Sequence, residues 1–545
     1  MNVLRGSCGF LAAALVAATV FFSPSGSSPA QAQTPAQAPD FDRSPSGFLT
    51  PTTGGMPANA WNGTSLATAK RLVSALPAAP RSRALRDLQF KLLVSQINAP
   101  APDGSPPPSL FARKVDRLAA MGEAENLNEM VRSIGAYADP ALAATTVNAL
   151  MMAGEKASAC QIVRTVKLPE PFARRADTVC KLVAGDNAGA LAAALPLKAT
   201  DPVFYKLVEI AAEGLSPTAP PPAQLDGPAM VMLDLAFVQP SAATLRTAQP
   251  PLMRSLVAHR TLPVPTRLEI AERGEALAIV EASKLGDLYL DAVRDKVVLP
   301  APMTRRARLV AAARGAQNAQ QLISAIATVY GEERGGPLFP TIARASAGAL
   351  MNVAPKPEYA GVAQEVMRGL LLLGDRQQTR AWTRLALSAA FNDARAMGSL
   401  ERLMPLMAVA GVDDAKRLPP EEVNRWYELI AKENPAQAQV RGYLLLELFR
   451  AIGFDIPAKS TTLPETPGNA RLVSPPAATM QALQAAATGK RRAEAALLAS
   501  VAIGETPLAE LHPAAVGAIV RALRQVGEEY TGRLFAVEIA IAHGL

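Results

Sequence analysis

The stretch that decides the fold is residues 141–197, which read ALAATTVNALMMAGEKASACQIVRTVKLPEPFARRADTVCKLVAGDNAGALAAALPL. It contains one short pattern twice: an apolar helix end, a glycine, an acidic residue, and a small residue five positions after the glycine. The first copy is built on Gly154 and Ala159, and the second on Gly185 and Ala190. Such internal repetition predicts a helical repeat protein.

Each glycine has a physical role at the end of a helix. A helix commonly ends with a residue in the left-handed conformation, which glycine adopts without steric cost, so Gly154 and Gly185 are expected just past a helix C-terminus. The acidic residue that follows each glycine lies where the next helix begins, and negative charge is favourable there. The small residue further along lets the second helix approach the first closely.

The order Leu-Gly-Asp, three variable residues and Ala resembles the turn between the two helices of a tetratricopeptide repeat. Less complete copies occur at Gly374, Gly489 and Gly527, and at Gly489 the position of the small residue holds Glu494. The resemblance implies an all-α protein, an α-solenoid of TPR-like antiparallel helix pairs separated by proline-rich spacers. The alternative is a set of helix pairs that each use a glycine turn without belonging to that family.

The N-terminus has the pattern of a secretory signal peptide. Arg5 is followed by an apolar run over residues 10–22 and by the small-residue sequence Ala30-Gln31-Ala32. We therefore expect export to a bacterial periplasm with cleavage after Ala32. The alternative is an uncleaved segment that anchors the protein in the inner membrane.

Proline-rich and polar stretches divide the remainder, which is longer than one hydrophobic core usually supports. Segments of this composition bury too little apolar surface to offset the entropy of ordering. The predicted organisation is a signal peptide at 1–32, a disordered tether at 33–63, a helical block at 64–215, a spacer at 216–228, a central helical block at 229–455, a second spacer at 456–478 and C-terminal helix pairs at 479–545.

Several chemistries are not supported by any motif. The chain has 3 histidines, none at helical spacing from another, and it lacks the G-x-S-x-G and G-x-x-x-x-G-K-[ST] patterns. Adjacent carboxylates on a helix point about 100° apart and do not converge on one substrate atom. Such pairs are Glu332 with Glu333, Asp413 with Asp414, Glu421 with Glu422, and Glu528 with Glu529. We expect no catalytic residue, cofactor or metal.

The formal net charge is +8, and removal of the signal peptide would take away the positive charge of Arg5. Basic residues gather in short clusters without interleaved aromatic residues, which does not favour nucleic-acid binding. The clusters are Arg81, Arg83 and Arg86; Arg174 and Arg175; Arg305, Arg306 and Arg308; and Lys490, Arg491 and Arg492. They are expected on solvated helix faces, and the functional alternative is weak attraction to anionic envelope surfaces.

Two cysteines, Cys160 and Cys180, follow the predicted cleavage site. If their helices are antiparallel neighbours joined near Pro169, both cysteines lie at nearly the same height, so a disulfide is expected in an oxidising compartment. The alternative is a pair of buried free thiols.

The expected function is that of an exported, non-catalytic scaffold or adaptor that binds envelope proteins. The alternative is a peptidoglycan-acting envelope enzyme or its helical accessory region. Some lytic transglycosylases carry a catalytic domain on such a superhelix, but no stretch here resembles that domain.

Overall fold

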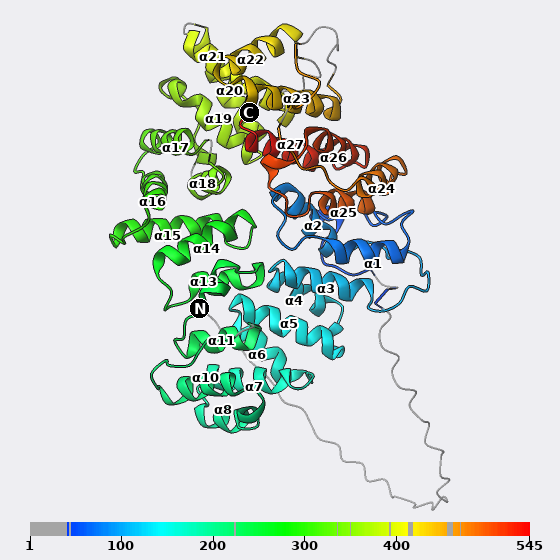
Figure 1. Cartoon of the computed structure of the whole chain (residues 1–545), viewed down its shortest axis with the longest axis vertical. Coiled ribbons are helices and arrows are strands. Elements are labelled where there is room, and N and C mark those ends of the chain that lie inside the picture. The colour runs from blue at the N-terminus through cyan, green and yellow to red at the C-terminus, as the bar shows by residue number, and fades with distance from the viewer. Residues whose placement is uncertain are drawn as a thin grey trace, which may run out of the picture. The chain divides into compact units, whose positions relative to one another are not determined.

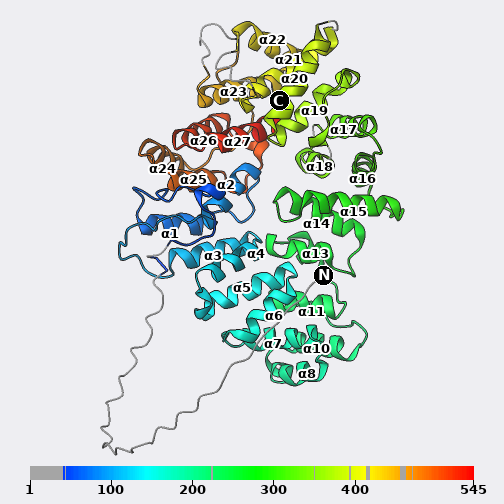
Figure 2. The same cartoon turned by 180° about the vertical axis from the view of Figure 1, so that it is seen from behind.

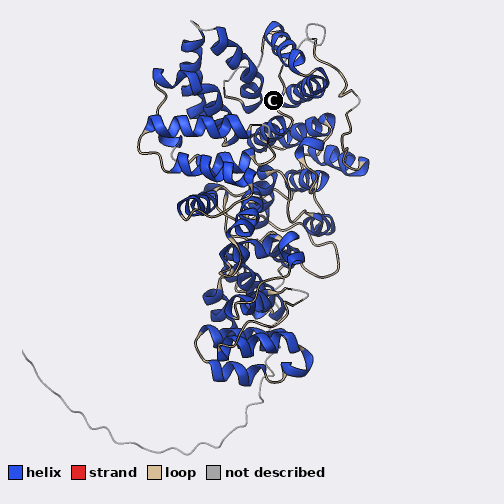
Figure 3. Cartoon of the chain, turned by 60° about the vertical axis from the view of Figure 1, so that its left-hand side comes forward, coloured by secondary structure: helices blue, strands red, loops and turns tan. Residues whose placement is uncertain are grey.

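The computed structural model describes residues 41–42, 45–222, 225–334, 336–348, 350–391, 394–412, 418–454, 462–468 and 470–545. These residues form 27 α-helices and six short 3-10 helices, and they include two isolated β-bridges but no strand (Figure 3). The predicted all-α, solenoid-like fold is confirmed. The predicted signal peptide at 1–32 lies outside the described residues.

The N-terminal helices begin at the capping residues that the sequence provides. The hydroxyls of Ser65, Ser82 and Ser109 each accept a hydrogen bond from the amide three residues further on. The helices of this part are α1 (Leu66–Ala75), α2 (Arg83–Val94), α3 (Leu110–Ala120), α4 (Ala124–Ser133), α5 (Pro140–Ala153), α6 (Lys156–Thr165), α7 (Phe172–Val183), α8 (Asn187–Ala194), α9 (Leu197–Thr200) and α10 (Pro202–Glu213).

The central part follows the proline-rich segment after α10, and its first helix is capped by the Asp226 carboxylate. Its helices are α11 (Gly227–Leu235), α12 (Ala242–Arg246), α13 (Met253–Ala258), α14 (Val264–Ala276), α15 (Ala282–Arg294), α16 (Ala301–Arg314), α17 (Ala319–Glu333), α18 (Phe339–Ser346), α19 (Ala363–Leu372), α20 (Arg376–Ala390), α21 (Ala394–Ala410), α22 (Pro420–Glu433) and α23 (Pro435–Ile452). Consecutive helices pack as neighbours, for example α15 with α16 and α16 with α17.

The C-terminal part comprises α24 (Ala477–Thr488), α25 (Arg492–Ile503), α26 (Pro513–Gln525) and α27 (Glu529–Ala542). Its helices contact both of the other parts. α26 packs against α23 and α27 against α21, whereas α25 packs against α1 and α2, and α27 against α2. Figures 1 and 2 both show α1 and α2 beside this C-terminal group, so the first helices of the array contact the last ones.

One continuous set of buried apolar side chains runs through all three parts, from Met56 to Leu545. Its largest members include Trp382, Tyr289 and Phe111, each essentially without exposed surface. Because the buried sets of neighbouring helix pairs join, each pair is stabilised by the next, as expected for a repeat array.

The predicted disordered tether at 33–63 is wrong for residues 45–63. Met56 is fully buried, Trp61 is 3% exposed, and the amide of Met56 donates to the Ser95 hydroxyl at 2.8 Å. The amide of Gln96 donates to the carbonyl of Leu49 at 2.8 Å. The composition of the segment predicts disorder, because ordering it costs conformational entropy. The burial of Met56 and Trp61 and the backbone hydrogen bonds offset that cost.

Candidate functional site

Four of the five predicted turn glycines have the expected left-handed conformation. The φ angles are +89° at Gly154, +81° at Gly185, +73° at Gly374 and +84° at Gly527. In each turn the amide of the acidic residue after the glycine donates to a carbonyl five residues earlier, at distances from 2.8 to 3.1 Å. The small residues that follow are all buried: Ala159, Ala190, Thr379 and Gly532.

At Gly489 the predicted turn is wrong by one residue. Gly489 has a φ of −77°, and Lys490 takes the left-handed place with a φ of +55°. The amide of Arg491 donates to the carbonyl of Ala486 at 2.9 Å, which is the bond made by the acidic residues of the other turns. The residue five positions after Lys490 is Ala495, fully buried, so the small position is present in the shifted register.

A further turn of the same geometry was missed. Gly122 has a φ of +77°, and the amide of Glu123 donates to the carbonyl of Leu118 at 3.0 Å. Its sequence, Met121-Gly122-Glu123, has the apolar, glycine, acidic order. The position that is small in the other turns holds Leu127 here, which is why the pattern did not reveal it.

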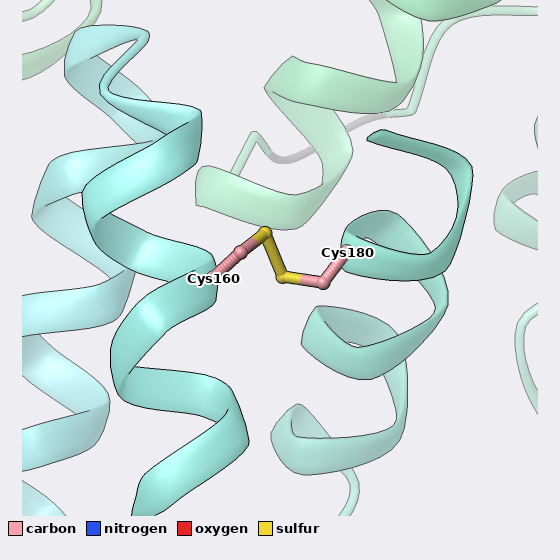
Figure 4. Close-up of a disulfide and its surroundings, with 2 residues drawn as sticks. All are labelled: Cys160 and Cys180. Carbon is pink, nitrogen blue, oxygen red and sulfur yellow. A yellow bond between two sulfur atoms is a disulfide. The ribbon is translucent and has the colours of Figure 1, made fainter. Parts of the chain in front are cut away.

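Cys160 and Cys180 form the predicted disulfide. Their sulfur atoms are 2.00 Å apart and their Cα atoms 5.4 Å apart, and both side chains are buried. Figure 4 shows the two side chains directed toward one another from α6 and α7, which pack as neighbours. The bond therefore joins two consecutive helices next to the first repeat turn.

The contact between the first and last helices includes hydrogen bonds between polar groups. The Ser82 hydroxyl donates to the Glu538 carboxylate at 2.6 Å, and the Ala84 amide donates to its other oxygen at 3.0 Å. Glu538 thus accepts bonds from the N-terminal end of α2, where a negative charge is favourable. Burial nevertheless raises the pKa of Glu538 to about 7. Nearby, the Thr64 hydroxyl donates to Glu494 at 3.0 Å.

The same junction includes the central part of the chain. The Arg344 guanidinium donates to both oxygens of Glu275 at 2.6 and 2.8 Å, and the Glu275 side chain is 1% exposed. Arg83, at the start of α2, donates to the backbone carbonyl of Glu275 at 3.3 Å. Helices α2, α14, α18 and α27 are therefore joined by one set of charged and hydroxyl side chains.

In each predicted basic cluster one arginine bonds a carboxylate of another helix or loop, so the expected solvated face is wrong for that arginine, while other members of the clusters are exposed. Arg306 donates to Glu272 at 2.9 and 3.0 Å, and the Tyr289 hydroxyl donates to the same carboxylate. The other pairs are Arg86 with Glu123, Arg175 with Asp226, and Arg492 with Glu528. These arginines connect helices.

Arg305 and Arg308 line an open groove of about 560 Å³ on α16. We call it the α16 groove. Its lining residues are Leu299, Ala301, Thr304, Arg305, Arg308, Leu309 and Glu332. A smaller cavity of about 210 Å³ lies beside Gly154, and its charged wall is an ion pair of Lys156 with Asp234 at 2.6 Å. Arg260 also lines the second cavity, so each of the two linings has two cationic side chains and one carboxylate.

The three histidines lie apart and make local contacts. His259 is buried, which lowers its pKa, and its Nδ1 lies 3.2 Å from the Thr261 hydroxyl. His512 accepts a bond from the Ala514 amide at 3.3 Å, and burial lowers the pKa of His543 to about 4. The described residues contain no group of three or more histidine, cysteine or acidic side chains that could hold a metal ion.

In two of the adjacent carboxylate pairs one member links helices. Glu333 pairs with Arg305 at 3.2 Å, and Glu528 accepts from Arg492 at 2.8 Å. Asp413 and Asp414 lie outside the described residues. No helix in the described part of the chain is both long and apolar enough to cross a bilayer. Comparison with protein-family models, with characterised proteins and with solved structures finds no match.

Proposed function

We propose that the protein is an exported, non-catalytic helical-repeat scaffold that binds other proteins of a bacterial cell envelope. The observation that supports this proposal is that buried carboxylates join helices to one another. Glu272 and Glu275 bridge helices within the central part, and Glu538 joins α27 to the start of α2. Charged groups engaged in this way hold a framework in shape, and an extended framework of helix pairs presents long surfaces to partners.

The resemblance of the glycine turns to those of tetratricopeptide repeats supports the same function. Six of the turns described above share the left-handed residue and the same backbone bond, at Gly122, Gly154, Gly185, Gly374, Lys490 and Gly527. Fold likeness by itself does not establish function. We therefore assign protein binding as a proposal that needs a direct test.

Export to the periplasm is part of the proposal. The apolar N-terminal run ahead of Ala32 has the signal-peptide pattern, and disulfides such as Cys160–Cys180 persist mainly in oxidising compartments. Mass-spectrometric N-terminal analysis of the native protein is expected to find Gln33 as the first residue, in the periplasmic fraction. An intact Met1 in the membrane fraction would contradict this and favour an anchored protein.

The scaffold function is tested with the mature protein and envelope extracts. We expect stoichiometric recovery of a partner protein after crosslinking, direct binding of that partner after purification, and no release of soluble fragments from peptidoglycan. Release of fragments that increases with protein concentration would overturn the scaffold proposal. Failure of the purified partner to bind would also count against it.

A further inference from the structure

One face of α16 lines the α16 groove along most of the helix. Ala301, Thr304, Arg305 and Arg308 have the spacing of a single helical stripe, and all four line the groove. The opposite stripe, which includes Ala307 and Val310, is buried. The helix therefore keeps one face in the core and turns the other outward without covering it with any described residue.

Three of the four arginines of this helix lie at or beside the groove and have different surroundings, and the fourth, Arg314, pairs with Asp287. Arg306 points inward to the buried Glu272, and Arg305 pairs with the buried Glu333 at 3.2 Å while its own side chain stays 56% exposed. Arg308 is exposed and makes no ion pair or hydrogen bond within the described part of the chain. The groove thus contains one arginine without a partner and a second that is only partly engaged.

Apolar side chains lie directly beside these cations. Leu299 and Leu309 line the groove and are partly exposed, and the preceding residue, Val298, is 90% exposed. An exposed apolar floor beside an unpaired guanidinium is suited to a ligand that has both an apolar group and an anionic group. Glu332, on α17, adds a negative charge at the groove, which disfavours a uniformly acidic ligand.

We propose that the α16 groove binds a short acidic segment of a partner protein in which a bulky apolar side chain lies next to one or two carboxylates. The apolar side chain contacts Leu299 and Leu309, and a carboxylate pairs with Arg308. This inference rests on the proposed scaffold function and names its binding surface. Charge complementarity selects the segment, and the apolar contact supplies most of the affinity.

The same features argue against an anionic membrane as the ligand. Adhesion to lipid headgroups typically uses clusters of about 4–8 basic residues. The groove offers two arginines and an opposing carboxylate, Glu332, within a concave apolar setting. A peptide with mixed apolar and acidic side chains matches that arrangement better than a flat anionic surface does.

The test is selection of peptides from a random display library on the mature protein, followed by fluorescence anisotropy with synthetic versions of the enriched peptides. We expect enriched peptides to combine aspartate or glutamate with a large apolar residue. Arg308→Glu should weaken their binding by about tenfold or more. Leu299→Ser should also weaken it, and binding should fall with added salt.

Arg81→Glu is the matched control, because Arg81 is an exposed arginine of another basic cluster with no partner within the described residues. Its binding should stay within about twofold of the wild type. Circular dichroism and thermal unfolding check that each variant is folded. The proposal is overturned if no acidic, apolar peptide is enriched, if Arg308→Glu binds as well as the wild type, or if phosphatidylglycerol vesicles bind in an Arg308-dependent way.

Failure here is distinguishable from failure of the scaffold function. A purified envelope partner that binds the wild type and the Arg308→Glu and Leu299→Ser variants equally would leave the scaffold proposal standing and remove the groove from it. Absence of any partner would instead count against the scaffold itself.

Discussion

The Glu538 carboxylate in α27 accepts a hydrogen bond of 2.6 Å from the Ser82 hydroxyl at the start of α2, across 456 positions of sequence. Its other oxygen accepts the amide of Ala84 at 3.0 Å. Ser82 caps α2 through its own oxygen at the same time, by accepting from the amide of Leu85 at 3.2 Å. One carboxylate therefore joins the last helix of the array to the capped end of the second.

The first prediction concerns the pH dependence of this contact. Burial raises the pKa of Glu538 from 4.5 to about 7, with smaller effects of Arg344 and Asp87. Between these pH values the folded protein holds a proton that the unfolded chain has released, so its stability falls as pH rises from 4.5 to 7. Glu538→Gln should reduce this pH-dependent loss of folding stability by about 2 kcal/mol.

Urea unfolding at pH 5 and pH 8 measures the effect, and hydrogen exchange of the α2 amides reports it locally. Glu170→Gln is the control, because the Glu170 side chain is 60% exposed and lies far along the chain from α27, with a 3.7 Å ion pair to Arg174. An equal loss of stability between the two pH values in the wild type and in Glu538→Gln would show that another group is responsible.

The second prediction concerns Lys114, a lysine that is 1% exposed. Burial lowers its pKa to about 8, and among the described residues its ammonium donates to the Ser46 carbonyl and hydroxyl, at 3.3 and 3.4 Å. Between pH 8 and 10.5 the unfolded chain holds a proton that the folded protein lacks, so this group raises stability as pH increases. In the Lys114→Met variant the free energy of unfolding should therefore increase less between pH 8 and 10.5 than in the wild type.

At pH 7 the same variant should be as stable as the wild type or more stable by about 1 kcal/mol, because it removes a buried charge that has no counter-ion among the described residues. Lys181→Met is a matched control on a more exposed lysine. A loss of several kcal/mol on Lys114→Met would mean that the bonds to Ser46 outweigh the cost of burying the charge.

The third prediction concerns the disulfide. Thiol titration of denatured, unreduced protein from its native compartment should detect no free thiol at Cys160 or Cys180. Replacing both cysteines with alanine should lower the free energy of unfolding by roughly 3 kcal/mol, since the bond closes a loop of 20 residues. Reduced wild type should lose a similar amount. Two free thiols in each chain would disprove the bond, and one would indicate pairing between chains.

The fourth prediction tests the shifted repeat register with two glycines. Gly185 has a φ of +81° and no atom within 4 Å of an added Cβ, so Gly185→Ala should cost about 1–2 kcal/mol through backbone strain alone. Gly489 has a helical φ, and an added Cβ would mainly displace the Arg491 guanidinium. Gly489→Ala should therefore be neutral or stabilising by up to about 1 kcal/mol. Thermal unfolding of both variants measures the two changes in stability. Equal losses of stability would indicate that Gly489, and not Lys490, occupies the left-handed position of the turn.

The sequence predicted the local features well. The turn glycines Gly154 and Gly185 depend on residues a few positions apart. The disulfide joins two consecutive helices, so helical geometry and loop length sufficed to place both cysteines at one height. The shift at Lys490 was missed because a non-glycine residue adopts the left-handed conformation there, with its Nζ held by the carbonyl of Gln525 at 2.8 Å.

Sequence by itself thus determined the helices, their capped ends and the pairing of neighbours, because those depend on contacts within one or two turns of chain. Tertiary structure alone decided that Trp61 is buried, that Thr64 meets Glu494, and that Glu538 meets Ser82. It also decided which arginines form ion pairs between helices and that Arg308 lies exposed in a groove. Partners more than 400 residues apart leave no periodic pattern in the chain, so only the packing of the whole array brings them together.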